Sequence, residues 1–281
     1  ARRTLLEVRE RRVKPLRDDK ILTGWNGLMI SGVLDAYQTL GNPAYLAMAE
    51  KALAFLLERA YHNGRLFRTV TGGQGKLNGY LDDYAFLSAA LIDAFEATAR
   101  PAYLDQAREL TAVMLEQFWD VQSGGCFFTG KDHEPLIQRM KTGEDSAIPS
   151  GNAVAAMNFL RLSHYTGEHA YLDKAEQTFR LFRTHMGQNP FGTSSMLCAL
   201  DFYLAKPKEI VLAGTRDSAE MTDLLSKIYG RYVPNKTLVV MEGGGKGARY
   251  VPESAKGKTT IDGKPTAYVC HNFTCSLPVT A

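Results

Sequence analysis

The sequence predicts a mainly helical protein: a partial (α/α)6 toroid of helical hairpins over residues 1–205, followed by a small α/β domain over residues 206–281. Three observations support this prediction. Long segments place apolar residues at helical spacing. A short phrase recurs at the start of every second helix. The composition then changes near Lys206-Pro207, where short apolar runs typical of buried strands begin.

The predicted helices come in pairs. The ranges are Gly27–Leu40 with Ala44–Ala60, Tyr80–Thr98 with Ala102–Trp119, and Gly151–Tyr165 with Ala170–Met186, while Ser194–Leu204 stands alone. The second helices open with Pro43-Ala44-Tyr45-Leu46, Pro101-Ala102-Tyr103-Leu104 and His169-Ala170-Tyr171-Leu172. Strand-like hairpins at 63–68 and 123–128 follow the first two pairs. The first helices are rich in small apolar residues and the second carry charge, as expected for an inner and an outer ring. An open α-solenoid would have shorter repeats without hairpins.

The last part of the chain predicts a βαβ unit. Residues 209–214 and 237–241 read as buried strands, which we expect to be parallel with a right-handed crossover. Between them a helix runs to about Tyr229, capped by Asp217 or Ser218. A third strand follows at Thr266–Cys270. The glycine-rich run 243–247 reads as a flexible turn, because no Ser or Thr follows Lys246 as a phosphate loop requires.

Composition excludes several classes of protein. With 45% hydrophobic and 22% charged residues among 281, the chain can bury a core. A net charge of +3 is too weak to indicate a nucleic-acid or anionic-membrane surface. No stretch approaches the roughly 20 apolar residues that span a bilayer. Four cysteines do not make a disulfide scaffold, so we expect a reducing, cytoplasmic location.

The candidate site lies where the inner helices begin, because their free N–H groups suit carboxylates and hydroxylated ligands. Carboxylates, aromatic rings and amides gather in these segments, and this chemistry suits a sugar. The predicted catalytic residues are Asp82, Asp83, Asp19 and Asp145. The predicted substrate-binding residues are Trp25, Asn26, Tyr80, Tyr84, Ser150 and Asn152. Each also has a purely structural interpretation, as a helix cap or a core residue.

No metal site or cofactor is predicted. Cys270 and Cys275 stand at C-x4-C, which is neither the C-x-x-C redox motif nor half of a zinc site with a second matching pair. We interpret them as buried or structural thiols. None of the six histidines stands at the start of an inner helix.

Four ordered motifs carry a family resemblance: 18–30 (DDKILTGWNGLMI), 80–87 (YLDDYAFL), 149–152 (PSGN) and 270–275 (CHNFTC). They resemble the thioredoxin-domain-containing proteins of the YyaL and spermatogenesis-associated type. The resemblance implies that this sequence is the C-terminal part of such a protein, without its thioredoxin-like domain. It also implies a six-hairpin toroid similar to glycosidases and N-acylglucosamine 2-epimerases. Those epimerases use paired histidines, so any catalysis here falls to carboxylates.

Three functions remain open. The first is a carbohydrate-active or carbohydrate-binding toroid, glycosidase- or epimerase-like if it is an enzyme. The second is a non-catalytic scaffold for the missing thioredoxin-like domain or a protein partner, and the third is a redox role through Cys270 and Cys275. The chain starts at Ala1 within a helical pattern, Thr4–Arg12, and its hairpins are too few to close a ring. We therefore expect an open apolar flank, covered by the missing N-terminal region or by a second copy of the chain.

Overall fold

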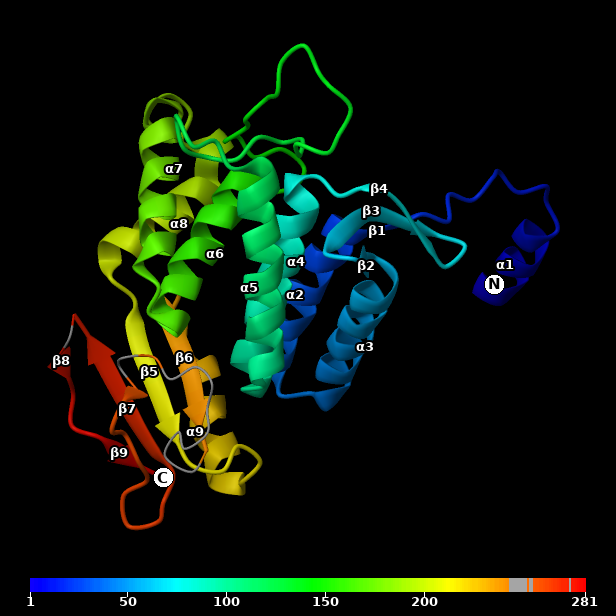
Figure 1. Ribbon diagram of the computed structural model, residues 1–281. Helices are drawn as coiled ribbons and strands as arrows, with labels where there is room; N and C mark the ends of the chain where they lie inside the picture. The colour runs from blue at the N-terminus through cyan, green and yellow to red at the C-terminus, as the bar shows by residue number, and fades with distance from the viewer. Residues whose placement is uncertain (243–251, 253–254, 273) are drawn as a thin grey trace.

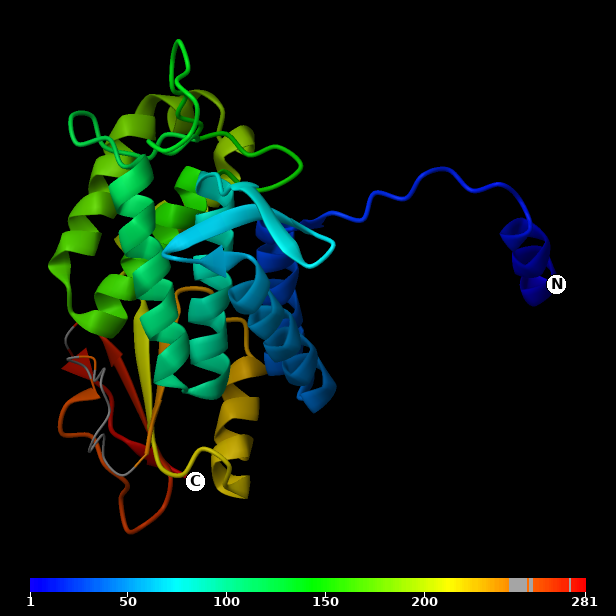
Figure 2. The same cartoon turned by 45° about the vertical axis from the view of Figure 1, so that its right-hand side comes forward.

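A computed structural model describes residues 1–242, 252, 255–272 and 274–281 (Figure 1), so the glycine-rich run 243–247 lies outside the described residues. Helix α1 (Arg2–Glu10) buries no residue and stands away from the body on an extended segment (Figure 2). None of the described helices combines the length and the apolar character that crossing a membrane needs.

The helical body has two layers, which confirms the predicted hairpins. The inner layer is α2 (Thr23–Leu40), α4 (Leu81–Thr98), α6 (Gly151–Thr166) and α8 (Ser194–Ala205). The outer layer is α3 (Pro43–Arg59), α5 (Pro101–Phe118) and α7 (His169–Gln188), with the short 3-10 helix η1 (Phe191–Thr193) before α8. Neighbouring inner helices pack on one another, and each outer helix packs on the inner helix before it. Most of α4 is buried, since it has inner helices on both sides and α5 behind it.

The first predicted hairpin is confirmed and is longer than expected. Strand β2 (Tyr61–His62) pairs with β3 (Arg65–Thr71), and β3 continues into β4 (Gln74–Asn78). Strand β1 (Ile21–Leu22) adds to the other edge of β3. Asn63 and Gly64 form the first turn with φ of 51° and 74°, the left-handed region that Asn and Gly tolerate best.

The second predicted hairpin, at 123–128, is wrong as a strand pair. Only one β-bridge forms there, between Trp119 and Cys126. Gly124 and Gly125 both have positive φ, 74° and 69°, so the chain turns through two successive left-handed residues and cannot remain extended. The Asp120 side chain holds this turn by accepting from the Gln122 amide at 2.9 Å.

The C-terminal sheet confirms the predicted βαβ unit. Strands β5 (Lys208–Ala213) and β6 (Lys236–Met241) are parallel, and α9 (Ala219–Tyr229) connects them with Ser218 as its N-cap. Strand β7 (Thr266–His271) is antiparallel to β5, and β8 (Thr274–Cys275) and β9 (Val279–Thr280) pair with β7.

The sheet joins the helical body through one of its faces. Val211, Val239 and Met241 belong to the core of the helical body. The alternate positions Ile210, Leu212, Leu238 and Val240 pack with α9 residues in a second, smaller core. Strands buried on both faces lose the alternation of apolar and polar residues, which explains their continuous apolar runs. The division into two domains after residue 205 stays a prediction.

Helix α2 leaves some of its apolar side chains exposed to solvent. Met29 and Leu40 are 67% and 66% exposed. This agrees with an open flank, and what covers it stays a prediction.

A close contact between α2 and α4 generates a test. A Cβ on Gly27 would lie 2.8 Å from the backbone carbonyl carbon of Phe86, so α2 and α4 can touch only where no side chain intervenes. We expect Gly27→Ala to destabilise the fold by about 2 kcal/mol through overpacking. Gly32→Ala is the control, because nothing lies within 4 Å of its Cβ, and it should gain up to about 1 kcal/mol from helix propensity. Urea unfolding measures both; equal effects would contradict the packing argument.

Candidate functional site

The starts of α2, α4 and α6 meet around a small cavity of about 20 Å³. Its lining residues are Leu22, Gly24, Trp25, Arg68, Asp82, Asp83, Phe86 and Ile148. The structure therefore brings together three of the predicted site residues, Trp25, Asp82 and Asp83.

Asp83 is buried and fully engaged by the protein. Its Oδ1 accepts from the Gly24 amide at 2.9 Å, and its Oδ2 accepts from the Tyr80 amide at 2.9 Å. Arg68 of β3 reaches the same Oδ2 at 3.4 Å. Burial raises the pKa of Asp83, while these donors and the charge of Arg68 act in the opposite direction. Asp83 thus ties the start of α2 to the start of α4 and to the hairpin.

Asp82 is less engaged by the protein than Asp83 is. Burial, followed by the neighbouring charge of Asp83, raises its pKa to about 6. Arg68 and a hydrogen bond from the Gly151 backbone lower it only in part. A Cβ on Gly151 would lie 2.3 Å from Asp82 Oδ1, so glycine at the start of α6 lets the carboxylate approach the helix. A carboxyl with a pKa near 6 suits general acid catalysis close to neutral pH.

Trp25 and Tyr80 supply the aromatic surface beside these carboxylates. Trp25 lies in the first turn of α2 and is 60% exposed, unlike most tryptophans. Tyr80 precedes α4, where its ring stacks on Phe128 at 4.8 Å between centroids. The Arg68 guanidinium lies over the Tyr80 ring at 4.8 Å.

Four other predicted binding residues make structural contacts. The Tyr84 hydroxyl accepts from the Leu66 amide at 2.9 Å, and its ring is in the core. Asn26 donates to the Leu22 carbonyl at 2.8 Å within its own turn. Ser150 caps α6 by accepting from the Ala153 amide.

Asn152 is 1% exposed and bonds both backbone groups of Cys126 and the carbonyl of Thr142. Its carbonyl and amide are therefore occupied by the loop that precedes α6.

The two remaining predicted carboxylates lie away from the cavity. Asp145 accepts from the Ser150 amide at 2.8 Å and the Ser195 amide at 2.8 Å, so it joins the starts of α6 and α8. Burial raises its pKa, but these hydrogen bonds outweigh burial and the net shift is downward. Asp19 lies on the exposed segment before β1, where it forms an ion pair with Arg17.

Sequence reasoning missed Arg68 and His133. Arg68 lies on the predicted hairpin, which also carries Arg65, so the sequence did not show which arginine faces the buried carboxylate. His133 comes from the loop after α5, and its ring packs against Tyr80 at 4.7 Å between centroids. Burial lowers its pKa. Loop residues far from the helix starts gave no periodic signal that could place them here.

Within the described part of the chain, no group of three His, Cys, Asp or Glu side chains is arranged to hold a metal ion. The thiol interpretation of Cys270 and Cys275 is wrong, because the two form a disulfide bond between β7 and β8. They face each other directly across the hairpin, which the spacing alone did not reveal.

Helical hairpins in two layers, with carboxylates at the inner-helix starts, define a six-hairpin, glycosidase-like toroid region. Residues 15–189 match the sequence profile of glycosyl hydrolase family 76, and the chain belongs to this family.

The resemblance to the spermatogenesis-associated type is also confirmed. The chain is 34% identical to human spermatogenesis-associated protein 20 over 98% of its own length and 32% identical to the rat protein. It spans only 37% of the length of the human relative.

Solved structures support the toroid fold. A family 76 α-mannanase of Bacteroides thetaiotaomicron matches 78% of this chain and 58% of its own, with a TM-score of 0.55 and 17% identity. Cellobiose 2-epimerase of Spirochaeta thermophila matches 60% of this chain and 44% of its own, with a TM-score of 0.50 and 22% identity. At these identities the likeness concerns the fold.

The pKa of Asp82 predicts a pH-dependent stability difference. A carboxyl whose folded pKa of about 6 exceeds its ordinary value of 3.8 binds more protons in the folded state between these limits. It therefore destabilises the fold progressively as pH rises through this window, and the cost is complete above pH 6. Asp82→Asn removes this cost, so the stability of the variant relative to wild type should rise by about 2 kcal/mol between pH 4 and pH 7.

Urea unfolding at a series of pH values measures that difference. Asp19→Asn, which removes an exposed carboxylate outside the cavity, is the control for the loss of one negative charge. A stability difference for Asp82→Asn that does not change with pH would contradict the raised pKa of Asp82.

Proposed function

We propose that this chain is the carbohydrate-active region of its protein, with Asp82 as the general acid of a glycosidase-type reaction. The observation that carries the proposal is the pairing of Asp82 and Asp83 on one cavity wall at the inner-helix starts, with the pKa of Asp82 raised to about 6. Membership of glycosyl hydrolase family 76 supports the same substrate class.

The residues divide the chemistry among them. Protonated Asp82 donates its proton to the glycosidic oxygen of the leaving sugar as the bond from that oxygen to the anomeric carbon breaks. A water molecule adds to the anomeric carbon and returns a proton to the Asp82 carboxylate. Asp83, the second carboxylate on the wall, provides negative charge beside the positive charge that develops on the sugar ring. The indole of Trp25 offers a face for the C–H surface of a sugar. The toroids of known structure to which the chain is similar include an α-mannanase and a cellobiose 2-epimerase. Because carboxylates line this cavity, hydrolysis fits it better than epimerisation by paired histidines.

A non-catalytic scaffold is the second candidate, and two observations favour it. The cavity holds about 20 Å³, far less than a sugar ring needs. The side chains of Asp83, Asp145 and Asn152 also accept hydrogen bonds from backbone amides of the protein itself. In that role the same residues would hold the inner helices in register for a partner.

Substitution of Asp82 and Trp25 separates the two functions. The probes are α-mannan oligosaccharides and cellobiose, assayed for binding by calorimetry and for cleavage by released reducing ends. We expect Asp82→Asn to reduce cleavage at least roughly 100-fold with little change in binding, as loss of a general acid does. Trp25→Ala should weaken binding roughly tenfold through the lost stacking surface.

Asp19→Asn is the matched control, because Asp19 is an exposed aspartate off the cavity wall. If wild type neither binds nor cleaves any of these sugars, the carbohydrate proposal fails and the scaffold function stands.

A further inference from the structure

The disulfide between Cys270 and Cys275 is asymmetric in its exposure. The two residues are direct partners in the antiparallel pairing of β7 with β8. Cys270 is only 3% exposed, whereas Cys275 lies in the exposed end of the hairpin. A thiol approaching from solvent therefore meets the sulfur of Cys275 first. The leaving sulfur would be the buried one, Cys270 Sγ.

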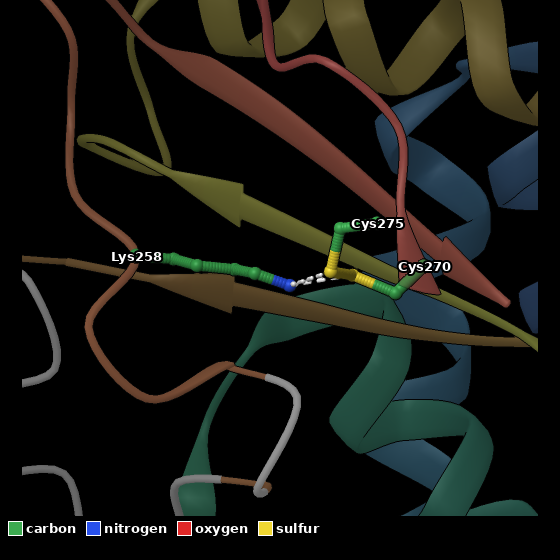
Figure 3. The surroundings of a disulfide bond; sticks show 3 residues. All are labelled: Lys258, Cys270 and Cys275. Carbon is green, nitrogen blue, oxygen red and sulfur yellow. Dashed lines mark hydrogen bonds between the residues drawn. A yellow bond between two sulfur atoms is a disulfide. The ribbon is translucent and has the colours of Figure 1, made fainter. Parts of the chain in front are cut away.

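A lysine stands beside that leaving sulfur (Figure 3). Lys258 Nζ lies 2.6 Å from Cys270 Sγ and 3.3 Å from Cys275 Sγ, and it comes from the segment that precedes β7. Its ammonium also lies 5.4 Å from the ring centroid of Tyr268. A neutral disulfide gains little from an adjacent cation. A thiolate gains much, because an ammonium stabilises the charged form of a cysteine.

The neighbouring charged groups bind other partners, as their hydrogen bonds show. Burial lowers the pKa of Lys258, while the charge of Glu209, the β5 partner of Cys270, raises it. The Glu209 carboxylate also bonds His164 at 3.2 Å. Lys206 reaches the same hairpin but bonds the side chain of Asn272 at 2.9 Å. His271 bonds the carbonyl of Ala205. Among the described contacts, the amine that touches the disulfide is that of Lys258.

We propose that Cys270–Cys275 is a thiol–disulfide exchange site, attacked at Cys275 by a dithiol reductant. The reductant's thiolate forms a mixed disulfide with Cys275 Sγ. The Cys270–Cys275 bond breaks and its electron pair leaves on Cys270 Sγ, beside the Lys258 ammonium. The second thiol of the reductant then attacks the reductant sulfur of the mixed disulfide. Cys275 leaves as a thiolate, and the reductant is left with an internal disulfide. The chain ends with two reduced cysteines and the reductant with one disulfide, so two electrons and two protons have been transferred.

Site mapping on the unaltered chain tests the direction of attack. The folded protein is treated with glutathione, quenched by alkylation and digested, and the mixed disulfide is located by mass spectrometry. We expect glutathione on Cys275 and alkylation of Cys270, while buried Cys126 stays unmodified until the protein is unfolded. Glutathione on Cys270 instead, or no opening of the pair in the folded chain, would overturn the proposal.

Substitution of Lys258 tests the stabilised leaving group. Dithiothreitol reduces wild type, Lys258→Met, Lys258→Arg and Lys206→Met under native conditions, and the release of the two thiols is timed. We expect Lys258→Met to slow reduction roughly three- to tenfold, since the leaving thiolate loses its cation, and Lys258→Arg to retain most of the rate. Lys206→Met is the matched control and should leave the rate unchanged. Equal rates for Lys258→Met and wild type would refute the role of the lysine.

Discussion

The inner layer depends on carboxylates that bind the backbone at helix starts. Asp83 accepts from the Gly24 amide of α2, Asp145 accepts from the Ser195 amide of α8, and the Asp82 carboxylate lies against Gly151 at the start of α6. The first N–H groups of a helix have no partner within the helix and carry its positive dipole end. A carboxylate from a neighbouring segment satisfies both needs at once. Four successive inner helices are linked in this way, each to the next.

This constraint also separates two adjacent aspartates that look equivalent in the sequence. Asp83 faces two amides and the Arg68 guanidinium, so its carboxylate holds α2, α4 and β3 together. Asp82 faces one glycine amide and the charge of Asp83, and its pKa rises to about 6. The two adjacent aspartates therefore have different electrostatic environments at one helix start. In the function proposed above, Asp83 fixes the helix on which Asp82 acts as the general acid.

The sequence was sufficient for the helices and for the parallel pair of β5 and β6, because apolar periodicity and cap residues are local signals. It also placed Trp25, Asp82 and Asp83 at one end of the layer. It could not separate ligand-facing side chains from those that bind backbone, as Asn152 and Asp145 show, since both kinds are polar residues at helix starts. Helix α2 begins at Thr23, earlier than periodicity predicts. Its first turn is held by Asp83, which accepts from the Gly24 amide, and a partner so distant in sequence leaves no local signal. Arg68 and the Cys270–Cys275 disulfide depend on strand register, which composition and spacing do not determine.

Amide hydrogen exchange tests the central claim most directly, because it reports each helix start separately. The comparison is between wild type, Asp83→Ala, Asp145→Ala and Asp19→Ala. We predict that Asp83→Ala speeds exchange at Gly24 roughly tenfold or more, as loss of a hydrogen bond to a charged group does. Asp145→Ala should act in the same way at Ser150 and Ser195, and Asp19→Ala at none of these positions. Wild-type exchange at Gly24 and Ser195 in these variants, or a uniform loss of protection across all helices, would contradict the claim that carboxylates hold the inner helices at their starts.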